Sequence, residues 1–411
     1  MSSRSSAFAR SMAPLSVPVF RAIWIANLAS IIGGMVQSVG AAWLMTELTS
    51  SNQLIALVQA CAMMPLLFFG VFAGAIADNY DRRLVMLTAQ GGMLVVSAIL
   101  TFVTGRGSIS PTLLLVLTFG IGAGTALNAP AWQASVRAQV EPQHLPYAIA
   151  LNTLAFQMGR SVGPALGGLV ISLGGPQWAF AFNSVSYLAL IIVLSRWKPV
   201  FERRERTPMF RAIGTGLRFC GQSRPVRRIL LRACVVGLGA ASYQALLPAI
   251  IRDIVGGDEL DYGFCLAAFG VCSIFVAVSV QGLREKYGAE NVIGTAALIM
   301  AAALAMAPFA SVIWFQLVVA SAAGGAWVAM LSTLNMAMQL RAPDAILGRC
   351  LAIYQATAFG ALAGGAYLAG LIADLSSLEA AATGASIWLL LSFLMRFLAP
   401  MPARDEGRVV P

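Results

Sequence analysis

Long apolar runs recur along the whole chain, and short polar segments separate them. Twelve runs span residues 21–45, 53–77, 83–104, 111–136, 145–173, 177–196, 229–251, 262–283, 289–309, 312–340, 350–373 and 378–399. A helix needs about 20 apolar residues to cross a bilayer, and each run reaches about that length. Polar residues within the runs are too scarce to form the polar face of a soluble helix. The pattern predicts an all-α polytopic membrane protein with 12 transmembrane helices.

A polar segment near the middle divides these runs into six and six. We expect an N-terminal six-helix half at 1–196, a cytoplasmic linker at 197–228 and a C-terminal six-helix half at 229–411. Within the linker, residues 209–220 fit either an amphipathic helix on the inner membrane surface or a solvated connection.

One sequence offset relates the two halves. A shift of 207 residues pairs Arg21 with Arg228, Gln37 with Gln244, Asp78 with Glu285, Tyr80 with Tyr287 and Asn128 with Asn335. Because polar residues are rare in these runs, repeated polar matches at one offset indicate an internal duplication. Transporters are often built from such repeats, so the halves are expected to be pseudo-symmetric.

Composition narrows the class of protein. The chain of 411 residues is 59% hydrophobic and only 11% charged, with a mean hydropathy of +0.80. A soluble domain is about a quarter charged, so a soluble enzyme, a disordered scaffold and a secreted disulfide module are all excluded. The six cysteines form no CxxC pair, and most lie in apolar runs, where they read as packing residues. We expect no metal site and no cofactor.

The positive charge follows the predicted topology. The chain has 27 Lys and Arg against 17 Asp and Glu, which gives a net charge of +10. Nearly all the basic residues fall at the termini, in the central linker and in the loops on that side, whereas the opposite side holds only Arg106 and Arg252. By the positive-inside rule, both termini and the linker lie in the cytoplasm. The same distribution excludes nucleic acid as a partner.

The loop between the second and third spans carries a motif. Its positions are Gly74, Asp78, Arg82 and Arg83, a glycine followed four residues later by an aspartate and then by a basic pair. Here the chain resembles the major facilitator superfamily, although Asn79 and Asp81 depart from the usual basic residue and glycine. The resemblance implies a cytoplasmic latch that holds the two halves together in one state. Asp78 would cap a helix or pair with an arginine.

The fifth span carries a second motif, made of Gly159, Gly163, Pro164, Gly167 and Gly168. Small residues at this spacing allow close helix contact. The run is similar to the GxxxGPxxGG motif of the superfamily's exporters, while ordinary GxxxG packing is the alternative. The second half has only a weak counterpart, which favours the functional interpretation.

Further runs narrow the resemblance. Residues 41–45, 128–133, 163–168 and 332–339 are similar to the transmembrane secretion effectors, the branch that includes the enterobactin exporter. The resemblance covers essentially the whole chain. It implies a monomer in the lipid bilayer that exports small-molecule cargo across a bacterial inner membrane by alternating access. The alternatives are a broad-specificity multidrug efflux pump, an importer on the same fold and a membrane-embedded enzyme. An enzyme would need clustered His, Asp, Glu or Cys at membrane depth, and no such cluster occurs.

In this superfamily the first, fourth, seventh and tenth spans face a central cavity, which the resemblance carries over to this chain. The cavity candidates are Gln37, Asn128, Gln244 and Asn335 in symmetric pairs, with Trp132, Tyr243 and Gln339 as secondary candidates. Amides can hydrogen-bond cargo, or one another across helices.

Arg160 is the most specific candidate for a contact with cargo, because a guanidinium at membrane depth is costly and normally has a partner. It could bind an anionic cargo or hold helix-end carbonyls. None of the acidic residues lies in the middle of a span, so the cavity should disfavour cations and accept neutral or anionic cargo, siderophore-like compounds included. If a proton is the coupling ion, its carrier is either an acid at a membrane edge, such as Glu47, Asp78 or Asp253, or the cargo, which would then carry the charge itself.

Overall fold

A computed structural model describes residues 12–198, 209–343 and 346–401, except for the side chains of 71, 75, 78 and 209–213. These residues form helices and no strand. In the N-terminal half the helices are α2 (Pro18–Leu48), α3 (Asn52–Asn79), α4 (Arg82–Gly105), α5 (Pro111–Ser135), α6 (Leu145–Gly174) and α7 (Pro176–Arg196). In the C-terminal half they are α9 (Arg224–Ile250), α10 (Glu259–Tyr287), α11 (Ala289–Met306), α12 (Ile313–Gln339), α13 (Leu347–Leu375) and α14 (Leu378–Phe393).

Eleven helices in the described part of the chain are long and apolar enough to cross a membrane. The remaining long helix, α6, has 30 residues but carries Asn152, Gln157 and Arg160 along its length. It packs lengthwise against α2 and α10, so it lies inside the bundle with the other spans. The predicted layout of 12 helices in two halves is therefore confirmed.

Local sequence signals set where several helices begin. Ser51 and Ser110 cap α3 and α5 by accepting from the backbone N–H of Leu54 and Leu113. Asp258 caps α10 in a capping box with Asp261. Such caps satisfy backbone donors that have no partner in the first turn.

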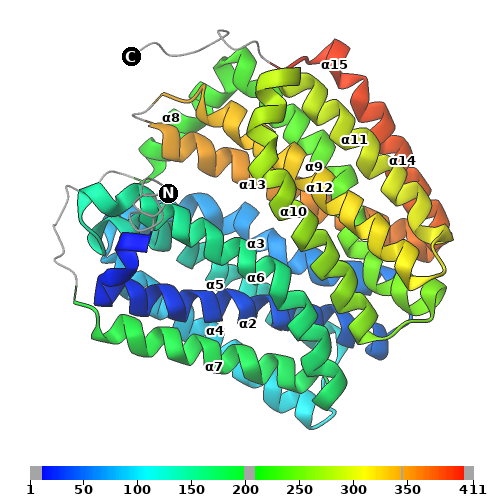
Figure 1. Ribbon diagram of the computed structural model, residues 1–411, viewed down its shortest axis with the longest axis horizontal. Coiled ribbons are helices and arrows are strands. Elements are labelled where there is room, and N and C mark those ends of the chain that lie inside the picture. The colour runs from blue at the N-terminus through cyan, green and yellow to red at the C-terminus, as the bar shows by residue number, and fades with distance from the viewer. Residues whose placement is uncertain (1–11, 199–208, 344–345, 402–411) are drawn as a thin grey trace, which may run out of the picture.

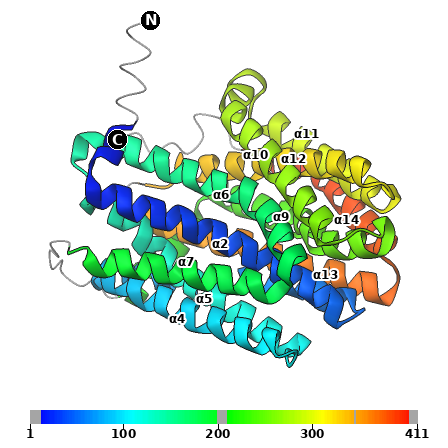
Figure 2. The same cartoon turned by 60° about the horizontal axis from the view of Figure 1, so that its bottom comes forward.

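The same packing pattern occurs in both halves. In the N-terminal half α2 packs on α6 and α7, α3 on α5, and α4 on α5 and α7. In the C-terminal half α9 packs on α13 and α14, α10 on α12, and α11 on α12 and α14. The halves meet where α3 lies along α13 and α6 lies along α10. In Figure 2, α2, α7 and α4 run side by side, while α10, α11, α12 and α14 form a separate group.

The bundle has two ends. We call the end with the α2–α3, α9–α10 and α13–α14 connections the distal end, and the end where α2 begins and α14 ends the proximal end. In Figure 1 the N-terminal helices run roughly horizontally, whereas α10 and α14 slope from upper left to lower right. The two halves are thus inclined to each other.

Part of the linker is helical, as one of the two sequence interpretations expected. Helix α8 (Met209–Gln222) precedes α9 at the proximal end. A Cβ at Gly216 would lie 3.1 Å from Cβ of Arg349 on α13, so this helix packs closely on the C-terminal half.

Candidate transport pathway

The glycine motif of α6 packs one face of this helix against α2. A Cβ at Gly159 would lie 2.4 Å from Cγ2 of Ile31, and one at Gly163 would lie 2.4 Å from Cβ of Met35. Since neither space could hold a methyl group without movement, these glycines let α2 and α6 approach within the N-terminal half.

The other face of α6 meets α10 of the opposite half. A Cβ at Gly168 would lie 2.7 Å from the backbone oxygen of Glu259, and one at Gly263 would lie 2.8 Å from that of Pro164. A Cβ at Gly270 would lie 2.6 Å from the backbone oxygen of Arg160. Backbone therefore touches backbone between the halves, from Arg160 to the distal end of α6.

The side chain of Arg160 lies between the halves and contacts aromatic rings. Its guanidinium carbon is 5.4 Å from the ring centroid of Phe269 on α10 and 6.0 Å from that of Trp327 on α12. These distances are at the outer range of cation–π contacts. Within the described residues, no carboxylate or carbonyl accepts a hydrogen bond from this guanidinium. The structure thus shows a membrane-embedded cation that lies against aromatic rings.

Three aromatic side chains of the C-terminal half form a cluster beside Arg160. Phe269 stacks on Tyr243 at 6.2 Å between centroids and meets Trp327 edge-on at 6.2 Å. Tyr243 is fully buried, and its hydroxyl has no hydrogen-bond partner among the described residues. We refer to Tyr243, Phe269 and Trp327 as the aromatic cluster. It combines apolar ring faces with one unused hydroxyl, next to a cation from the other half.

The two symmetric glutamines have different surroundings. Gln244 accepts a hydrogen bond of 3.2 Å from Nε2 of Gln59 on α3, so it joins the halves. Gln37 is buried, and its Oε1 accepts from Ser97 at 2.8 Å and from Asn183 at 2.6 Å. Gln37 thus ties α2 to α4 and α7 within one half in this conformation, and its contact with cargo stays a prediction.

The remaining amide candidates lie closer to the proximal end. Asn335 accepts from Nε2 of Gln339 one helical turn later on α12, and Gln339 is exposed. Asn128 and Trp132 on α5 are half-buried, and Oδ1 of Asn128 is enclosed without a partner among the described residues. Oδ1 of Asn128 is therefore a buried acceptor without a partner among the described residues, and contact of Asn128 with cargo stays a prediction.

The α3–α4 motif holds helix ends within the N-terminal half. Nη1 of Arg82 donates to the carbonyl of Ala134 at 2.9 Å, near the end of α5. Arg83 donates to the carbonyls of Leu194 and Ser195, at the end of α7. A cation is favourable at a helix C-terminus. The side chain of Asp78 lies outside the described residues, so the latch between the halves stays a prediction.

Gly74 and Asp81, in the same segment, are both described. A Cβ at Gly74 would meet nothing within 4 Å, so α3 makes no tight contact there in this conformation. Asp81 caps the start of α4, where its Oδ1 accepts from the backbone N–H of Arg83 at 2.9 Å.

Sequence reasoning missed several residues that join the two halves. Phe269 and Tyr262 stand in apolar runs, where aromatic residues give no signal of their own. Trp43 of α2 stacks on Tyr262 of α10, with 6.1 Å between centroids, and both are buried. The glycines at 263 and 270 were detectable, since small residues on a span suggest a close helix contact.

Known proteins share both the sequence pattern and the fold. The family described as transmembrane secretion effector matches residues 9–411. The enterobactin exporter EntS of Salmonella typhi is 25% identical over 95% of this chain and 96% of its own length. The staphyloferrin A transporter of Staphylococcus aureus is 20% identical over 63% of this chain and 66% of its own length.

Solved structures that resemble this chain show its fold and nothing further. A bacterial homologue of the human lysosomal transporter Spinster, in an inward-facing and occupied conformation, has a TM-score of 0.71 at 13% identity, covering 97% of this chain and 99% of that one. The POT family transporter PepTSo has a TM-score of 0.78 at 12% identity, covering 93% and 97%.

Proposed function

Because the chain belongs to the transmembrane secretion effector family of the major facilitator superfamily, we propose that it exports neutral or anionic small organic molecules, siderophore-like compounds included. It is a multi-pass membrane transporter and not an enzyme. In our proposal it works by alternating access across the bacterial inner membrane, as a monomer of two halves with the boundaries predicted above, and proton entry drives it.

The proposed orientation places the proximal end in the cytoplasm. The basic termini and linker support this, since cytoplasmic loops collect Lys and Arg. The distal end, where backbones of α6 and α10 touch, then closes the pathway toward the outside. We therefore propose that this conformation is inward-facing.

The environment of Arg160 is the observation that supports anionic cargo. A cation in the membrane without a hydrogen-bond acceptor is costly, and an anionic group of the cargo would relieve that cost. Phe269 and Trp327, the two rings that lie against the guanidinium, would pack against the organic part of the cargo once the site widens to admit it, since both rings are buried in this conformation. Because Arg160 belongs to one half and the cluster to the other, cargo bound there would contact both halves.

Two observations favour export over import. The glycine motif of α6 includes Gly168, which allows the close contact between the halves at the distal end, and the enterobactin exporter EntS aligns over nearly the whole chain. A broad-specificity efflux pump is the second candidate, because an aromatic cluster also accepts uncharged apolar molecules.

Export by cells tests the proposal. Compounds in the medium are compared with and without the gene, and then with Arg160→Gln, Arg160→Lys and the control Arg106→Gln at matched protein level. Arg106 suits the control because its guanidinium lies 4.1 Å from the ring of Phe102 on its own helix. The probes are pairs of an aromatic carboxylate and its primary amide. We expect Arg160→Gln to lose export of the carboxylate and keep that of the amide.

Arg160→Lys should restore little, because an ammonium cannot reproduce the planar fork of a guanidinium. Equal loss of both probes in Arg160→Gln would reject an anion site at Arg160. Unchanged medium composition without the gene, across all growth conditions tried, would contradict export. Selective export of cations would support the efflux-pump candidate with a different cargo site.

A further inference from the structure

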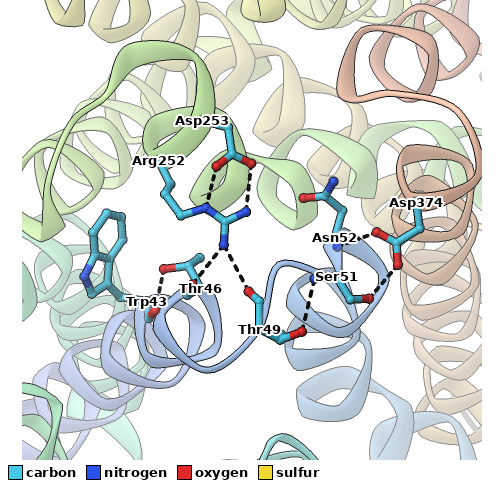
Figure 3. Close-up of polar contacts among 8 residues, drawn as sticks. All are labelled: Trp43, Thr46, Thr49, Ser51, Asn52, Arg252, Asp253 and Asp374. Atoms are coloured by element: carbon cyan, nitrogen blue, oxygen red, sulfur yellow. Dashed lines mark hydrogen bonds and ion pairs between the residues drawn. The ribbon is translucent and has the colours of Figure 1, made fainter.

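The connection between α2 and α3 is held at the distal end by two charged residues of the other half. Helix α2 ends at Leu48 and α3 begins at Asn52, so two helix termini of opposite polarity lie side by side. Arg252 follows α9, and Asp374 lies in the last turn of α13. Figure 3 shows both side chains pointing toward this connection from opposite sides.

Arg252 binds the C-terminal end of α2. Its Nη1 donates to the backbone oxygens of Thr46 at 2.8 Å and of Thr49 at 3.1 Å. The last carbonyls of a helix lack partners within the helix and carry partial negative charge, which favours a cation. Asp253 engages Nε and Nη2 of the same guanidinium at 2.5 and 2.8 Å and so orients the third nitrogen toward α2.

Asp374 binds the N-terminal end of α3. Its Oδ1 accepts from the backbone N–H of Asn52 at 2.5 Å, and its Oδ2 accepts from the hydroxyl of Ser51 at 2.5 Å. The first N–H groups of a helix carry partial positive charge, which favours an anion. Each helix end therefore receives the charge that it prefers.

We propose that Arg252 and Asp374 form a clasp that closes the extracytoplasmic mouth and must release before cargo can leave. The clasp lies where the backbones of the halves already approach closely, since a Cβ at Gly370, one turn before Asp374, would lie 2.8 Å from Cα of Gln53 on α3. All four bonds of Arg252 and Asp374 to the α2–α3 connection join one half to the other. An outward-open state separates these surfaces and breaks them.

The clasp depends on alternating access and on the proposed orientation, but not on which cargo is carried. Both side chains are partly exposed, and exposed ion pairs are weak one by one. Hydrogen bonds that involve a charged group are stronger than neutral ones. We therefore expect loss of either charge to raise the ratio of open to closed distal ends about tenfold, which corresponds to about 1.4 kcal/mol.

Distances between spin labels at the distal end test the clasp. Ser108 precedes α5 and Ser311 precedes α12, and both are exposed on opposite halves. Both are changed to cysteine and labelled in a background in which the six native cysteines are replaced and transport is retained. Pulsed dipolar spectroscopy on the purified protein in lipid nanodiscs, without cargo, then reports the populations of short and long distances.

Arg252→Gln and Asp374→Asn should each increase the long-distance population, and the double variant should increase it further. Arg106→Gln, which removes a distal arginine outside the clasp, should leave the distribution unchanged. If the Arg252→Gln protein does not accumulate in cells, the Asp374→Asn variant alone tests the clasp, because Asp374 binds the other helix end. Distributions in both single variants identical to that of the labelled parent would overturn the clasp. Such a result would leave the cargo proposal standing, since that proposal is tested by export of the two probes.

Discussion

A single methyl group added at Gly168 should push the distal end open. A Cβ there would lie 2.7 Å from the backbone oxygen of Glu259 and 3.2 Å from Cα of Leu260. Close carbon–oxygen contacts in proteins are about 3.3–3.6 Å, so α10 must retreat by roughly 0.6 Å or more. The opposing atoms are backbone and cannot rotate away. Gly168→Ala should therefore separate the distal ends of α6 and α10.

The size of the effect follows from the cost of overpacking, which is typically about 1–3 kcal/mol. Under the proposed mechanism only the inward-facing state holds this contact, so the whole cost falls on that state. The population ratio should shift toward the outward-open state by about 5- to 150-fold. The spin-label pair at Ser108 and Ser311 measures this shift directly.

Two glycines of the same half supply matched controls for Gly168→Ala. Gly34→Ala should have no effect, because a Cβ there meets nothing within 4 Å. Gly163→Ala should instead reduce the amount of folded protein, because its Cβ would lie 2.4 Å from Cβ of Met35 in the same half, whichever end is open. The reasoning is refuted if Gly168→Ala gives the same distance distribution as Gly34→Ala.

Three further predictions address the rest of the chain. Gln37→Leu should lower stability by about 1–3 kcal/mol, because it removes the acceptor of two buried donors, and thermal unfolding of the purified protein measures this; an unchanged unfolding temperature would contradict it. Asp78→Asn should slow export at unchanged protein level by shifting the populations of the two states, and export at the parental rate would exclude the latch. Reporter fusions should place Ser223 in the cytoplasm and Gly256 outside, and an outside location for Ser223 would invert the proposed orientation.

The fold could be predicted because bilayer-spanning helices leave a direct record in the sequence. The apolar runs had to be about as long as the bilayer is thick, and the observed helices follow them closely. Even α6, the long helix that is not among the eleven apolar helices of the described residues, falls on the predicted apolar run at 145–173. Its glycines were noticed as an exporter motif, and the structure gives them partners on both α2 and α10.

The side-chain environments could not be predicted in the same way. The offset of 207 residues relates Gln37 to Gln244, yet one lies inside a half and the other bridges the halves. Pseudo-symmetry governs backbone positions, whereas hydrogen bonds depend on neighbours such as Asn183 and Gln59. From the sequence, Arg252 could not be distinguished from other loop charges, because it binds backbone carbonyls and every residue has a carbonyl.

Binding of the two probes to the purified protein tests the central claim most directly. Trp327 lies beside Arg160, so in a background in which the other seven tryptophans are replaced its fluorescence reports occupation of the proposed site without requiring transport. An aromatic carboxylate and its primary amide are titrated against the parent chain and Arg160→Gln. A charged hydrogen-bonded contact contributes about 1.5–3 kcal/mol, so Arg160→Gln should weaken carboxylate binding by about tenfold or more. Amide binding should stay unchanged, whereas equal carboxylate affinity in the two proteins would contradict an anion site at Arg160.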